Sequence, residues 1–150
     1  TIDMVHDTLL RWCSFLDAEP EPSVVAVANV QHLATLVEGR LSRPEPSVLD
    51  LVTALHPTPA VGGDPRDVAL RVQREIEQLD RRRYAGPVGW IDAKGDGEIG
   101  IALRCGELAG DKKSIRIFAG CGIVAGSDPE REYSESQAKL LPMRTALERH

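Results

Sequence analysis

The sequence lacks a long apolar run, a cysteine motif and an excess of positive charge. Its longest apolar stretch, at 24–28, is far shorter than the roughly 20 residues that cross a bilayer, so we expect no membrane span. The 23 Asp and Glu outnumber the 18 Lys and Arg, and the net charge of −5 argues against a nonspecific nucleic-acid surface. Cys13, Cys105 and Cys121 form no Cys-x-x-Cys pair, so we expect neither a disulfide framework nor a zinc site, and a reducing cytoplasm as the location.

The composition is that of an ordinary folded chain. Hydrophobic residues make up 42% and charged residues 27% of the 150 positions, which predicts a core of ordinary size. The length suits one domain, residues 1–150, better than two. The chain begins with Thr1 and without a basic-then-apolar leader, and we expect that it starts partway into a longer protein.

Apolar spacing and turn residues predict an α+β fold of antiparallel strands and helices. The order is helix, strands, two helices, a three-stranded meander and a last helix. We expect a helix at 2–17, one or two strands within 24–37, a helix from Ser47 to His56, a shaped loop at 56–63, a helix from Asp64 to about Arg82, strands at 87–91, 99–105 and 115–124, and a helix from Asp128 onward.

Three charged residues of the last predicted helix share nearly one face. Glu132, Glu135 and Lys139 are three, four and seven positions apart. Two carboxylates there could hold a hard cation such as Mg²⁺, and the ammonium could meet an anionic ligand. From spacing alone, an exposed Glu135–Lys139 ion pair is the commoner explanation.

Several other polar or glycine positions allow either a functional or a purely structural explanation. Arg104 lies among apolar residues, where it either meets a carboxylate or points to solvent. Gly120 and Gly122 either bare backbone N–H groups to an anion or bend the strand. His32 and His56 are more often structural than catalytic. Tyr84 and Tyr133, two of few aromatic residues, could line a site or only pack.

Six segments of the chain form a pattern in their order and spacing. They are His-Pro-Thr-Pro-Ala-Val-Gly-Gly at 56–63, Tyr-Ala-Gly-Pro-Val-Gly-Trp at 84–90, Gly-Asp-Gly-Glu at 95–98, Ile-Ala-Leu-Arg-Cys at 101–105, Ala-Gly-Cys-Gly-Ile-Val at 119–124, and Ser-Asp-Pro at 127–129 with Glu135. Together they resemble the C-terminal part of the chorismate-utilising enzymes. The His-Pro-Thr-Pro-Ala loop followed by Gly-Gly is similar to isochorismate synthases in particular, because anthranilate and salicylate synthases usually carry a Phe-Pro opening.

The resemblance implies an Mg²⁺-dependent isomerase that converts chorismate to isochorismate, with antiparallel sheets flanked by helices. It implies that Glu135 is a metal ligand with Glu132 beside it. The general acid and base are expected in an N-terminal portion outside these residues, so no catalytic residue is assigned. The implied substrate-binding residues are Arg104, Gly120, Gly122, Lys139, Tyr84, Ala60 and His32.

Two alternatives remain open. The first is a salicylate synthase or another chorismate enzyme, which the His-Pro-Thr-Pro loop argues against. The second is a noncatalytic chorismate-binding module that is completed by a separate N-terminal chain. The sequence also leaves open whether isochorismate would feed menaquinone or siderophore biosynthesis.

Overall fold

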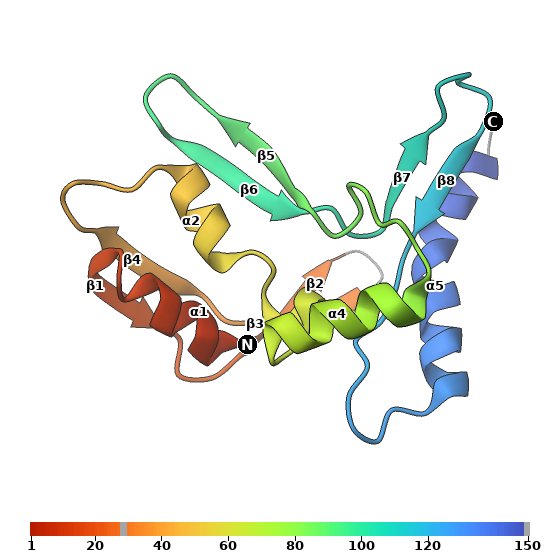
Figure 1. Cartoon of the computed structure of the whole chain (residues 1–150), viewed down its shortest axis with the longest axis horizontal. Helices are drawn as coiled ribbons and strands as arrows, with labels where there is room; N and C mark the ends of the chain where they lie inside the picture. The colour runs from red at the N-terminus through yellow and green to blue at the C-terminus, as the bar shows by residue number, and fades with distance from the viewer. Residues whose placement is uncertain (28–29, 149–150) are drawn as a thin grey trace. The chain divides into compact units, whose positions relative to one another are not determined.

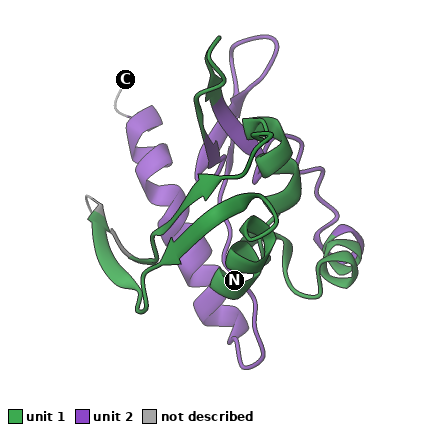
Figure 2. Ribbon diagram, turned by 90° about the vertical axis from the view of Figure 1, so that its left-hand side faces the viewer, with its two compact units in different colours: residues 1–73, 90–98 green, residues 74–89, 99–150 purple. Residues whose placement is uncertain are grey.

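The computed structural model describes residues 1–27 and 30–148, without the side chains of 27 and 30–32. It divides into two compact units, which Figure 2 colours separately: residues 1–73 with 90–98, and residues 74–89 with 99–150. The expected α+β class is confirmed, with short antiparallel sheets and helices (Figure 1). The expectation of a single incomplete domain stays a prediction.

The first unit contains short helices and two separate two-stranded sheets. β1 pairs with β4, and β2 pairs with β3, both antiparallel. One or two strands were expected within 24–37, and the structure has two there, β2 and β3. The bounds are α1 Ile2–Leu9, β1 Cys13–Ala18, β2 Ser23–Val27, β3 Val30–Ala34, β4 Val37–Leu41, α2 Val48–Leu55 and α3 Pro59–Gly62.

The predicted helix at 2–17 is wrong in its second half. α1 ends at Leu9, and β1 follows from Cys13 to Ala18. Leu16 of β1 lies opposite Gly39 of β4, more than twenty positions away. Pairing with a distant strand therefore outweighs the local helical spacing, which continues past Leu9.

Local signals determine α2. The Ser47 hydroxyl accepts a hydrogen bond from the Asp50 N–H at 3.2 Å, and the Asp50 carboxylate accepts one from the Ser47 N–H at 2.9 Å. This is a capping box, and it holds the pKa of Asp50 below its usual value. The helix predicted from Ser47 to about His56 is confirmed.

The 56–63 loop is shaped, as predicted, and includes the short helix α3. Gly63 ends it with φ +80°, a conformation that favours glycine. α4 then spans Arg66–Glu77 and not the predicted 64–82. It ends early because Gln78 adopts the left-handed region at φ +48°.

The predicted three-stranded meander is wrong. β5 (Pro87–Ile91) pairs with β6 (Gly97–Ile101), and β7 (Cys105–Leu108) pairs with β8 (Ile115–Phe118), as two separate sheets. The break lies at Arg104, which takes φ +49° and cannot continue a strand. The β7–β8 ladder therefore stops at the Cys105–Phe118 pair, well before the expected strand end at 124.

The last helix, α5, spans Pro129–Glu148. The Asp128 carboxylate accepts a hydrogen bond from the Arg131 N–H at 2.9 Å, as an N-cap does. The helix start predicted at Asp128 and Pro129 is therefore confirmed. Pro142 lies inside the helix.

Few apolar side chains are buried. Among the described residues, the buried hydrophobic ones are Ala85 (6% exposed) and Phe118 (7% exposed), both in the second unit. Large apolar side chains such as Leu33, Ile76 and Ile123 are more than two-thirds exposed. The expected core of ordinary size is therefore absent from the described part of the chain. No helix within those residues is long and apolar enough to cross a membrane.

Candidate functional site

The candidate site gathers at the end of the β7–β8 hairpin where Cys105 pairs with Phe118. The Tyr84 ring stacks on Phe118, with ring centroids 5.2 Å apart and planes 15° apart. The next residue, Ala85, is tied down because its N–H donates to the Ala102 carbonyl at 2.9 Å. Burial is the main cause that raises the pKa of Tyr84, so this phenol stays protonated at neutral pH.

Gly120 lies against Tyr84. A Cβ built on Gly120 would stand 2.8 Å from the Tyr84 hydroxyl oxygen, closer than real Cβ contacts come. A Cβ on Gly122 would meet nothing within 4 Å. The first glycine is therefore needed for its close approach to Tyr84, whereas the second has open space beside it.

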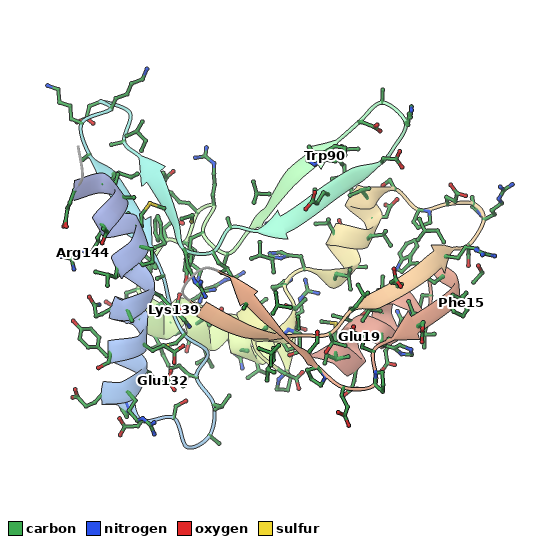
Figure 3. The ribbon with its side chains drawn as sticks, turned by 180° about the vertical axis from the view of Figure 1, so that it is seen from behind. Phe15, Glu19, Trp90, Glu132, Lys139 and Arg144 are labelled. Atoms are coloured by element: carbon green, nitrogen blue, oxygen red, sulfur yellow. The ribbon has the colours of Figure 1, made fainter. Side chains whose placement is uncertain are left out.

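Lys139 of α5 joins this glycine to a carboxylate. Its Nζ donates to the Gly120 carbonyl oxygen at 3.2 Å and lies 2.5 Å from a carboxylate oxygen of Glu135. Figure 3 shows Lys139 and Glu132 along α5. The hydrogen bond from Lys139, aided by its charge, lowers the pKa of Glu135. The ion pair that spacing favoured is confirmed, and it also contacts the glycine segment.

Glu132 contributes a backbone contact to the same segment. The Cys121 Sγ donates to the Glu132 carbonyl oxygen at 3.4 Å, and burial is the main cause that raises the pKa of this thiol. The Glu132 and Glu135 side chains lie one turn apart on α5. The described residues contain no group of three or more His, Cys, Asp or Glu that could hold a metal ion. Two carboxylates fit Mg²⁺ in kind, but the ion needs further oxygen ligands.

Arg104 stands at the bend between β6 and β7, half-buried, and not within a strand as predicted. It directly precedes the Cys105–Phe118 pair, and Gly120 follows that pair two residues later. Arg104 and the glycine segment therefore leave the same end of the hairpin. The backbone of Arg104, the Lys139 ammonium and the glycine backbone therefore lie toward one end of the hairpin in the second unit.

Two expected site residues belong to the first unit. Ala60 lies exposed in α3. His32 lies in β3 opposite Val25, and its side chain falls outside the described residues. His56, expected to be structural, has its pKa lowered chiefly by burial and further by Arg66, whose guanidinium donates to the His56 carbonyl at 2.5 Å.

Sequence reasoning missed the residues that hold Tyr84. Phe118 carries the Tyr84 ring, and the Arg81 guanidinium lies 5.9 Å from the centre of that ring. Arg81 is hidden in a run of three arginines, which looks like a solvated charged segment. Tyr84 and Phe118 are more than thirty positions apart, so no local sequence pattern reveals their contact.

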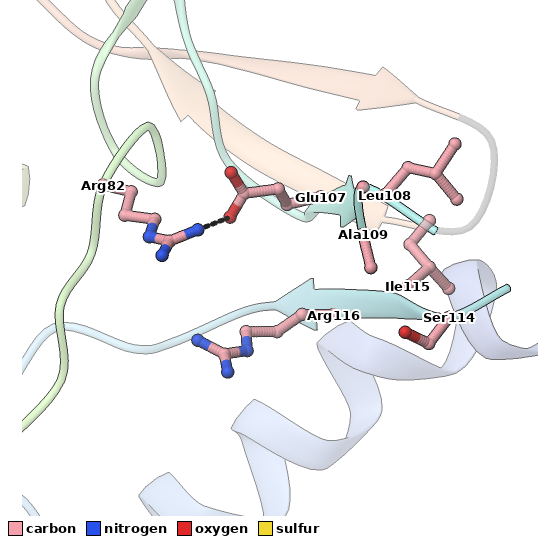
Figure 4. A pocket seen from close by; sticks show the side chains of 8 residues that line it. Arg82, Glu107, Leu108, Ala109, Ser114, Ile115 and Arg116 are labelled. Atoms are coloured by element: carbon pink, nitrogen blue, oxygen red, sulfur yellow. Dashed lines mark ion pairs between the residues drawn. The ribbon is translucent and has the colours of Figure 1, made fainter. Parts of the chain in front are cut away.

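A polar hollow lies at the other end of the same hairpin, with a volume of about 580 Å³ (Figure 4). Its Glu107 carboxylate pairs with Arg82 at 3.6 Å and with Arg83 at 3.2 Å. Arg116 lines the hollow as well, directly across the ladder from Glu107.

A family model described as "Chorismate binding enzyme" matches residues 1–148. Isochorismate synthase MenF of Bacillus subtilis is 44% identical over 97% of this chain and 30% of its own length. The vibriobactin-specific isochorismate synthase of Vibrio cholerae is 41% identical over 93% of this chain and 35% of its own. The chain thus spans about a third of the length of these curated relatives.

Solved structures agree with the sequence comparison. The crystal structure described as a 2,3-dihydroxybenzoate-specific isochorismate synthase from Bacillus anthracis matches 99% of this chain and 39% of its own. The TM-score is 0.93 and the identity 40%. Anthranilate synthase component I of Streptococcus pneumoniae matches 93% of the chain with a TM-score of 0.80 and 30% identity. The similarity therefore includes the arrangement of the backbone.

Proposed function

Because the chain belongs to the chorismate binding enzyme family, we propose that it forms the substrate-binding part of an isochorismate synthase. The substrate is chorismate, and the reaction of the whole enzyme is its isomerisation to isochorismate. The observation that carries this proposal is the convergence of Tyr84, Gly120 and Lys139 at the hairpin end beside Arg104. The named isochorismate synthases among the relatives support the choice within the family.

The charges of this end suit a dianionic substrate. Chorismate carries two carboxylates, and Arg104 and Lys139 supply two cations. The Gly120–Gly122 segment adds backbone N–H groups, and the open space at Gly122 allows a carboxylate to approach. In this proposal Arg104 clasps one carboxylate, Lys139 accompanies the one held at the glycines, and Tyr84 lines the site.

Mg²⁺ is part of the same proposal. It would be held by Glu135 and Glu132, and it would supply positive charge toward the substrate's oxygens. Lys139 lowers the pKa of Glu135, so in this proposal the ion shares a carboxylate that the lysine also contacts. Because only two carboxylates are offered, we expect weak Mg²⁺ binding without chorismate and stronger binding with it.

The general acid and base belong to the portion of the enzyme outside these residues. The substrate-side roles of Ala60 and His32, which belong to the first unit, stay predictions. We also propose a cytoplasmic location, supported by the three cysteines that form no disulfide.

The decisive experiment is chorismate binding by calorimetry, with and without Mg²⁺, with products analysed by chromatography. We expect binding that Mg²⁺ strengthens and no isochorismate from the 150-residue chain alone. Arg104→Ala should weaken binding at least tenfold, because an Arg–carboxylate pair is lost. Arg116→Ala, a matched arginine at the other end of the hairpin, should leave it unchanged.

Absence of chorismate binding would overturn the function proposed for this chain. Equal weakening by the two arginine variants would overturn the assigned site. For the metal, Glu135→Gln should abolish the effect of Mg²⁺ on chorismate affinity, and an undiminished effect would exclude Glu135 as a ligand.

A further inference from the structure

Arg81 is set apart from the two arginines that follow it. Its side chain is 27% exposed, whereas those of Arg82 and Arg83 are 59% and 88% exposed. Its Nε donates to one Glu77 carboxylate oxygen at 2.7 Å, and a second N–H bonds the other oxygen. A guanidinium held by two parallel bonds has a fixed plane as well as a fixed position.

That fixed guanidinium lies over the ring of Tyr84, 5.9 Å from its centre. A cation over an aromatic face attracts the ring, and more strongly where water is partly excluded. The other contact of the ring is the stack on Phe118. Tyr84 is therefore held by an ion pair at the end of α4 and by the core residue of β8.

The two neighbouring arginines attach the same segment to β7. Arg82 and Arg83 both pair with Glu107 of β7, as Figure 4 shows for Arg82. These pairs are more exposed than that of Arg81, so each contributes little by itself. They supply a comparison: three adjacent arginines of which one reaches Tyr84.

The hydroxyl of Tyr84 leads to the glycine segment. The hydroxyl oxygen lies so close to Gly120 that a Cβ on this glycine would be only 2.8 Å away from it. On the α5 side, the Lys139 ammonium donates to the Gly120 carbonyl oxygen. Gly120 is thus enclosed by a phenol and an ammonium. A displaced ring would release one of these two supports.

We propose that Arg81 is a positioning residue: with Glu77 it holds Tyr84 against Gly120, and so keeps the glycine backbone in the conformation that receives a substrate carboxylate. This rests on the proposed function for the identity of the ligand. The positioning itself is a property of the protein and can be tested without any ligand.

The ligand-free test uses the amide NMR spectrum of the chain. We expect Arg81→Met to displace the signals of Gly120 and Gly122, and Tyr84→Phe, which keeps the ring but removes the hydroxyl, to displace Gly120 alone. Arg83→Met should leave both glycines unmoved. Undisturbed glycine signals in a folded Arg81→Met chain would overturn the proposal.

A phenol titration separates loss of the contact from loss of the fold. The Arg81 charge lowers the pKa of Tyr84 while burial raises it, with Glu77, Cys105 and Cys121 raising it further. If Arg81 holds the ring, Arg81→Met should move the ring out of its buried place and return this pKa toward the ordinary value, with the unfolding midpoint showing that the chain still folds. A pKa that rises instead would mean that the ring stays in place without Arg81, and would overturn the proposal.

The binding test uses chorismate affinity. Arg81→Met should weaken binding by about tenfold, the size typical when an outer residue that orients a binding group is lost. Arg81→Lys, which keeps the charge without the two-bond fork, should recover part of it. Arg83→Met is the matched control. If the unsubstituted chain does not bind chorismate, the proposed function fails, and the NMR result alone decides the positioning.

Discussion

The two C-terminal hairpins are built from similar strand lengths and yet differ in what stabilises them. Every residue of β5 is exposed, including Trp90 at 56%. β8 ends on Phe118, which is 7% exposed and carries the Tyr84 ring. The candidate site lies at the second hairpin. A ligand site needs rigid support. Within the described residues, β7–β8 gains such support from the packing of Tyr84 on Phe118, whereas β5–β6 depends on its turn.

The turn of β5–β6 explains how that hairpin persists without burial. The Asp92 carboxylate accepts hydrogen bonds from the N–H groups of Lys94 at 2.8 Å and Asp96 at 3.0 Å. Gly95 adopts φ +92°, which favours glycine. Local turn chemistry can therefore set a register, but it buries no apolar surface.

The largest expected effect comes from removing the packing partner. Phe118→Ala should destabilise the chain by about 3 kcal/mol, because it deletes a buried ring and leaves a cavity under Tyr84. Trp90→Ala, on the exposed hairpin, should cost less than about 1 kcal/mol. Urea unfolding measures both. Similar losses at the two positions would end the distinction between the hairpins.

A smaller effect should distinguish the two glycines after β8. Gly120→Ala forces the new methyl against the Tyr84 hydroxyl and should cost about 1–2 kcal/mol by overpacking. Gly122→Ala meets open space, so its stability should stay the same. We expect both to weaken chorismate binding, the second without any change in thermal midpoint. A destabilising Gly122→Ala would show that this space is occupied by protein.

The capped helix α2 calibrates what purely local bonds contribute. Ser47→Ala removes the hydroxyl that accepts the Asp50 N–H and should cost about 1 kcal/mol. Ser47→Thr keeps an oxygen there and should cost less. Helix content and unfolding midpoint measure the change. A cost as large as that of Phe118→Ala would mean that local capping matters as much as the packing of β8.

The smallest expected effect concerns the ion pair on α5. Lys139 lowers the pKa of Glu135, so the pair stabilises the fold above the carboxyl's ordinary pKa and is lost as the pH falls through the lowered value. Lys139→Met should return the Glu135 pKa to its usual range. A carboxyl NMR titration reads this directly. An unchanged pKa would show that the pair does not persist in solution.

Sequence reasoning succeeded where the signal is local and failed where it is distant. Ser47 and Asp50 lie three residues apart, and Glu135 and Lys139 four, so helical geometry alone brings each pair together. β1 pairs with β4 across a long separation, and no spacing within Cys13–Ala18 reveals it. The end of α4 was missed for a different reason: a left-handed Gln78 has no marker in sequence.

The candidate site divides along the same line. Its charged residues and glycines were singled out from spacing and residue type, the resemblance gave them roles, and most of them belong to the second unit. The contacts that hold them were not predicted. Tyr84 contacts Phe118, and Lys139 contacts Gly120, and in each pair the two residues are far apart in the sequence and meet only in the folded chain. Each member of the three-arginine run has a carboxylate partner, and nothing in the sequence of the run indicates these pairings.

The backbone conformation of Arg104 lowers the stability of the fold at a position that we assign to substrate binding. An arginine at φ +49° carries a steric cost that glycine would not, so Arg104→Gly should raise the unfolding free energy above that of Arg104→Ala by about 1 kcal/mol. The same change deletes the guanidinium. A gain in stability combined with a loss of chorismate affinity would show that this position keeps an unfavourable conformation for the sake of its side chain.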